Sequence, residues 1–108
     1  MTTSDILERI LLPINDLWCV DNVQINEEEK SVYVHLSYKF DFVEIDGRDY
    51  PIYDYRHERN WRHLDLWQYK TYLTARIPRY KIGGEIRSVD VSWADTGERL
   101  TTLLEKKR

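Results

Sequence analysis

Cations and planar aromatic side chains are concentrated between Asn60 and Tyr80. This stretch holds two tryptophans, three tyrosines, three arginines, a lysine and a histidine within 21 residues. Guanidinium and ammonium groups neutralise phosphates and aromatic rings stack on bases, so these are the side chains that nucleic-acid binders use. The competing interpretation is an aromatic core whose cations form a solvated, salt-bridged face.

The distribution of charge favours a local basic surface. The chain has a net charge of -3, yet residues 1–47 carry 3 basic and 10 acidic side chains whereas residues 48–81 carry 8 and 4. Burying an arginine without a partner is costly, so the cations of the middle third must face solvent or carboxylates. We predict that this group contacts the phosphate backbone of double-stranded DNA: Arg56, Arg59, Arg62, Lys70, Arg76, Arg79 and Lys81.

The aromatic residues have a simpler expected role. In a small β-rich domain, large rings usually fill the core, because each buried ring removes about 150 to 250 Å² from water. We therefore expect Trp61, Trp67 and Trp93 to lie inside, Trp61 and Trp93 above all. Tyr72 and Tyr80 fall on the side of their strand opposite Leu73 and are expected to be exposed.

Other site chemistry finds little support in the sequence. Cys19 is the single cysteine, which excludes an internal disulfide, and its spacing from His35, His57 and His63 matches no metal-ligand pattern. His63 and Asp65 could act as a base and its orienting carboxylate, but no nucleophile stands in a characteristic loop beside them. We expect no catalysis, no metal, no cofactor and no small-molecule substrate.

The N-terminal segment has the pattern of a helix. Thr3 or Ser4 can cap free N–H groups, apolar residues recur at helical spacing from Ile6 to Leu11, and Pro13 follows. The sequence predicts a helix over about residues 4–12.

From Trp18 onward the apolar period changes to two, which indicates strands. Residues 18–25 and 32–40 are expected to form one hairpin, and Asp46-Gly47 a second, since this pair tolerates the positive φ of tight turns. Residues 69–81 read as a strand that ends, bulges or lies at an edge near Pro78. Gly83-Gly84 would reverse the chain into a last strand through Val89, Val91 and Trp93.

These elements predict an α+β class: one N-terminal helix packed on a small, twisted antiparallel sheet of successive hairpins. All 108 residues fit a single domain. Its hairpins would span about residues 18–94, and the tail 95–108 would lead into a downstream region. The sequence has neither a basic leader nor an apolar run of membrane-spanning length, so we expect a cytoplasmic protein without membrane contact.

The middle of the chain resembles the N-terminal region of bacterial insertion-sequence transposases of the ISL-three type. Residues 59–65 read RNWRHLD and residues 70–79 read KTYLTARIPR, preceded by Tyr53-Asp54 and followed by a VSWADTG segment at residues 91–97. The resemblance extends to the region around residues 20–23, and so over nearly the whole chain.

The resemblance implies a zinc-finger-like, DNA-binding module of a transposase. Family members carry cysteine knuckles before and after this pattern, whereas the corresponding stretches here, residues 45–50 and 80–85, read IDGRDY and YKIGGE. We therefore expect a degenerate, zinc-ribbon-like part without metal, in which hairpin pairing and aromatic packing replace the ion. The predicted function is transposon-end recognition, non-catalytic by itself, in a transposase or a truncated relative.

An alternative from another class is a protein-interaction or self-association module. The acidic first half of one copy would attract the basic second half of another, which makes a homo-oligomer the expected form.

Overall fold

A computed structural model describes residues 15–94 and 99–101. These residues form strands and turns and contain no helix, so the predicted α+β class is wrong and the described fold is all-β. The helix predicted over residues 4–12 lies outside the described residues, as does most of the tail. None of the described segments forms a helix of membrane-spanning length and apolarity.

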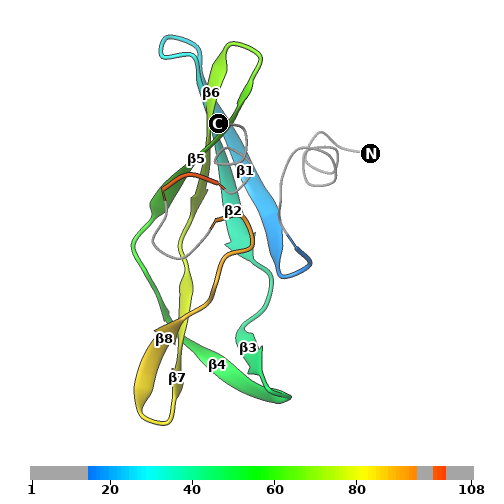
Figure 1. Cartoon of the computed structure of the whole chain (residues 1–108), viewed down its shortest axis with the longest axis vertical. Helices are drawn as coiled ribbons and strands as arrows, with labels where there is room; N and C mark the ends of the chain where they lie inside the picture. Colours follow the sequence, from blue (N-terminus) through cyan, green and yellow to red (C-terminus); the bar gives the residue numbers. More distant parts are fainter. Residues whose placement is uncertain (1–14, 95–98, 102–108) are drawn as a thin grey trace.

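The described residues form eight strands in two four-stranded sheets, which lie one beyond the other along the long axis of the molecule (Figure 1). Sheet 1 has the order β1-β2-β6-β5 and sheet 2 the order β3-β4-β7-β8. In chain order the strands are β1 (Trp18–Asn26), β2 (Ser31–Tyr38), β3 (Phe42–Ile45), β4 (Arg48–Tyr55), β5 (Arg59–Leu66), β6 (Tyr69–Ala75), β7 (Pro78–Ile82) and β8 (Glu85–Ser88).

The first two predicted hairpins are confirmed. β1 pairs with β2 and β3 pairs with β4, both antiparallel. The turn between β3 and β4 has positive φ at both central residues, 51° at Asp46 and 80° at Gly47, which is the geometry that such short loops prefer.

The strand predicted over residues 69–81 is interrupted near Pro78, as expected, but its two parts belong to different sheets. It divides at Arg76-Ile77 into β6, which belongs to sheet 1, and β7, which belongs to sheet 2. Pro78 has no N–H to donate, and β7 begins with it. The chain uses this position to pass from one sheet to the other.

The last predicted strand is also misplaced. Gly83-Gly84 does turn the chain, but the strand that follows is β8, and Val89, Val91 and Trp93 lie beyond it. The three apolar residues belong to no strand, and they are apolar because they contact the core. Val89 and Trp93 are buried, and Val91 packs against the same core.

Sheet 1 is not a plain succession of hairpins. β2 pairs with β6 in parallel, with Val34 opposite Leu73, and β6 pairs with β5 through a hairpin that the sequence did not predict. The outer edge of β5 is covered by residues 99–101, because the N–H of Arg62 donates to the carbonyl of Arg99 and the N–H of Thr101 to that of Arg62, both at 2.8 Å.

The core is centred on three tryptophans. Trp93 packs edge-on against Trp18 and Trp61, with ring centroids 4.8 and 5.2 Å apart. All three are at most 1% exposed, so the expectation for Trp61 and Trp93 is confirmed. Trp67, by contrast, is 82% exposed, and the expectation that it fills the core is wrong.

Candidate nucleic-acid interface

In the described part of the chain, three short linkers join consecutive strands of different sheets. One is residues 39–41, between β2 and β3, and the other two carry predicted site residues. Residues 56–58 lead from β4 to β5, and residues 76–77 lead from β6 to β7. These two linkers are bonded to each other: the N–H of Arg56 donates to the carbonyl of Ile77 at 2.9 Å, and Nε of Arg76 donates to the carbonyl of Arg56 at 3.0 Å. These bonds fix the backbone from which the cations project.

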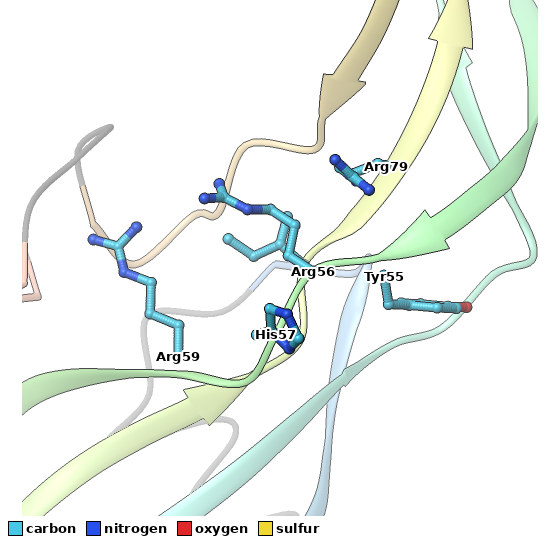
Figure 2. A pocket seen from close by; sticks show the side chains of 6 residues that line it. Tyr55, Arg56, His57, Arg59 and Arg79 are labelled. Atoms are coloured by element: carbon cyan, nitrogen blue, oxygen red, sulfur yellow. The ribbon is translucent and has the colours of Figure 1, made fainter.

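A pocket of about 380 Å³ opens beside these linkers. Figure 2 shows the guanidinium groups of Arg56 and Arg59 extending to the same side of the linker, with that of Arg79 beyond them on β7. Ile77 is buried and supplies an apolar wall. We call this site the junction pocket; it is lined by Tyr55, Arg56, His57, Arg59, Ile77 and Arg79.

Arg56, in the linker, and Arg59, at the start of β5, have different surroundings. The guanidinium of Arg59 lies over the ring of buried Trp61, 4.9 Å from its centroid. Such a cation–π contact orients the side chain. Arg56 is exposed at the first position of the linker. The sequence thus places two cations at the junction pocket, one of which lies against Trp61.

Arg79 is the third cation of the junction pocket, and it has a carboxylate partner. Nε of Arg79 donates to Asp54 Oδ1 at 2.6 Å, and a terminal nitrogen donates to Oδ2. The hydrogen bonds from Arg79 lower the pKa of Asp54 against the opposing effect of partial burial. In the same pair the Asp54 carboxylate raises the pKa of Arg79. The charge of Arg79 is therefore largely neutralised in place.

Arg76 lies next to the junction pocket and faces a different environment. Its guanidinium bonds to the carbonyls of Tyr55 and Arg56 and lies over the ring of Tyr55, 5.9 Å from the centroid. It lines a second, neighbouring pocket together with the acidic residues Asp21 and Glu58. Its role here is to brace the linker.

The other predicted cations are dispersed. Arg62 is bound to Asp65 and to the carbonyls of His63 and Thr71 in sheet 1. Lys70 lies at the start of β6, where its N–H donates to the carbonyl of Lys30, and Lys81 is exposed on β7 beside the Gly83-Gly84 turn. The β5–β6 turn, which precedes Lys70, and the β7–β8 turn, beside Lys81, lie at opposite ends of the molecule (Figure 1). The structure brings together Arg56, Arg59 and Arg79, and leaves the other four outside the pocket.

The sequence analysis did not assign Tyr55 and His57 to the site. Both lie next to Arg56, and both line the junction pocket. The sequence feature that could have indicated them is the interruption of strand alternation at residues 56–58, which marks a linker between two strands.

Among residues 15–94 and 99–101, no group of three or more His, Cys, Asp and Glu side chains gathers as a metal site would require. His63 is buried and bonded to Thr101 at 2.7 Å, and Cys19 lies on β1. The described residues therefore do not offer the four nitrogen and sulfur ligands of a structural zinc site.

Residues 46–81 match the family model described as the zinc-finger of transposase IS204/IS1001/IS1096/IS1165. The matched segment is one third of the 108 residues, and it contains β4, β5, β6 and every residue that lines the junction pocket. Neither a protein of curated function nor a solved structure gave a significant match to the chain.

Proposed function

We propose that this chain is a DNA-binding, transposase-related module, and that the junction pocket holds phosphates of duplex DNA. The observation that carries the proposal is the convergence of Arg56 and Arg59, with the Asp54-paired Arg79 beside them, where residues 56–58 and 76–77 pass between the sheets. All of these residues lie within the segment that matches the transposase zinc-finger model.

The chemistry of these side chains suits a phosphate. A guanidinium presents a planar fork of N–H donors that can bind two phosphate oxygens at once, and it stays charged at every physiological pH. Arg59 is already ordered over Trp61, so less side-chain freedom is lost when a phosphate binds. The pocket is concave and apolar on one side, which reduces competition from water.

The overall acidity of the chain restricts how DNA can approach. A net charge of -3 gives no general attraction to a polyanion. Binding through a few arginines must therefore be local and strongly dependent on salt. We propose that the acidic β1–β2 turn, where Glu27, Glu28 and Glu29 follow one another, points away from the duplex.

The finer role we propose is recognition of a transposon end without catalysis. In this role the phosphate contacts position the module and carry no sequence information themselves, as is general for such contacts. We also propose that hairpin pairing and the tryptophan core replace a structural metal in this segment.

A paired set of variants tests the junction pocket. R56Q/R59Q removes two cations at the pocket, and K70Q/K81Q removes two exposed cations from opposite ends of the molecule. Affinity for a duplex is measured across a range of salt concentrations for both variants and the wild type. We expect R56Q/R59Q to bind weakly and to reduce the slope of log affinity against log salt by about 1.8, since each neutralised phosphate contributes about 0.9.

K70Q/K81Q is the control, because it changes net charge by the same amount. We expect it to retain most of the wild-type slope. Equal losses in the two variants would show diffuse attraction in place of a site, and no binding of the wild type even at low salt would refute the DNA-binding function.

The structure gives no particular support to self-association. β1 is the long edge strand of sheet 1, but the register shifts between Val20 and Asn22, so Asp21 bulges from the ladder. A bulge and a charge on an edge both hinder pairing with a second copy.

A further inference from the structure

The outer face of sheet 1 carries a row of planar side chains, one from each strand. Gln24 on β1 is opposite Tyr33 on β2, Tyr33 is opposite Tyr72 on β6, and Tyr72 is opposite Arg62 on β5. Residues directly opposite one another share a face of the sheet. This face is distinct from the one that Val34, Leu73 and Trp61 present to the core.

The row forms a stack that is closed at one end. The rings of Tyr33 and Tyr72 are stacked, with centroids 5.1 Å apart and planes 13° from parallel. The guanidinium of Arg62 lies 5.5 Å from the Tyr72 centroid on β5 and is fixed by Asp65 and two backbone carbonyls. The Arg62 end of the stack is therefore rigid and occupied.

The other end of the stack is open. Among the described residues, no second ring or guanidinium contacts Tyr33, and a shallow hollow of about 510 Å³ adjoins it, lined by Gln24, Ile25, Asn26 and Tyr33. Gln24 uses one amide atom in a bond with His35 at 2.9 Å, and Asn26 Oδ1 accepts from the N–H of Glu29 at 3.0 Å. Each amide keeps its other group for a ligand.

We propose that this hollow binds an unpaired nucleobase, which extends the stack by one ring on Tyr33. Every base has a flat π-face that an aromatic side chain can cover, and the amides of Gln24 and Asn26 can bond to the edge of the base. The hollow matches this ligand because the half-buried Tyr33 ring lines it beside two amide groups, and none of its four lining residues is a cation.

The nearby charges define the binding mode. The turn that follows Asn26 begins with Glu27, Glu28 and Glu29, which repel phosphate. Affinity must therefore come from stacking and amide bonds, and it should change little with salt, in contrast to the junction pocket. This inference stands whether or not the junction pocket binds DNA.

The test adds first adenosine, a neutral probe, and then a single-stranded oligodeoxyadenylate to the full chain. Binding of each probe is monitored by NMR. We expect adenosine to shift the signals of Gln24, Asn26 and Tyr33 to a similar extent at low and high salt. For the oligonucleotide, Y33L should weaken binding about 5- to 150-fold, the range that one lost stacking contact produces, while Y33F, which keeps the ring, should bind like the wild type.

The matched control is Y53L, which removes a tyrosine that is 55% exposed on β4 of sheet 2. We expect it to bind both probes like the wild type. Unmoved Tyr33 signals in the presence of adenosine, or equal binding by Y33L and the wild type, would overturn the proposal, as would loss of binding in Y33F. R56Q/R59Q should bind adenosine normally, so failure at one site is distinguishable from failure at the other.

Discussion

Two aspartates determine which arginines of the middle third are already neutralised. Asp65 binds Arg62 on sheet 1, and Asp54 binds Arg79 at the junction pocket. Both pairs are partly exposed, so each contributes little to stability. Their importance for function differs, because only Arg79 lines the junction pocket.

Replacing Asp54 should strengthen DNA binding. D54N removes the carboxylate partner and leaves the Arg79 guanidinium available for a phosphate. We expect higher duplex affinity and a salt slope steeper by about 0.9, equivalent to one added phosphate contact. Titration of a labelled duplex at several salt concentrations measures both quantities.

D65N is the matched control, since it also removes one negative charge beside an arginine. We expect a much smaller change in duplex affinity, because Arg62 lies outside the junction pocket. Equal effects of D54N and D65N would mean that net charge, and not the position of Arg79, governs binding.

At the residue scale, the sequence correctly placed Trp61 and Trp93 in the core, but it wrongly placed Trp67 there and did not single out Trp18. It was wrong for Tyr80, which is only 7% exposed. The reason is the break at Arg76-Ile77: alternation counted through the break assigns Tyr80 to the outer face, whereas the new strand begins at Pro78 and turns it inward. Tyr72 is half-buried, since Tyr33 and Arg62 flank its ring.

At the scale of elements, turn-forming residues correctly predicted the turns that they occupy. The pairing of strands that are far apart in the chain could not be predicted from the sequence. Asp46-Gly47 and Gly83-Gly84 are turn formers, and both turns were found. The β5–β6 hairpin was missed because its turn, Trp67-Gln68, lacks glycine and asparagine, and because buried His63 interrupts the apolar alternation of β5.

The β5–β6 turn offers a test of this description. Trp67 has a φ of 55°, a left-handed conformation that asparagine adopts far more readily than tryptophan. Since Trp67 is 82% exposed, W67N loses little burial. We expect W67N to raise the free energy of unfolding by about 1 kcal/mol, measured as a higher urea midpoint by circular dichroism.

Q68N is the control for this turn. Gln68 is exposed and is not among the residues with positive φ, so the same substitution should give no gain. A W67N protein no more stable than Q68N would show that the turn has another geometry.

At the scale of the whole molecule, the parallel pairing of β2 with β6 determines where the cations lie. Between these two strands the chain enters sheet 2 and returns through residues 56–58, and after β6 it crosses again through residues 76–77. The two linkers meet at the same junction, where Arg76 bonds to the carbonyl of Arg56. No local pattern encodes this arrangement, because it depends on residues about forty positions apart in sequence coming into register. The sequence could predict a basic middle third, but not which of its cations would gather.

The most direct test of the account is a map of the residues that duplex DNA contacts in the wild-type chain. Backbone amide shifts are recorded by NMR while a duplex is added at low salt. We predict that the largest changes fall at residues 55–59 and 76–79, and that they disappear as salt is raised. Changes centred on the β1–β2 and β5–β6 turns, or no changes at all, would contradict the assignment of the junction pocket as the DNA-binding site.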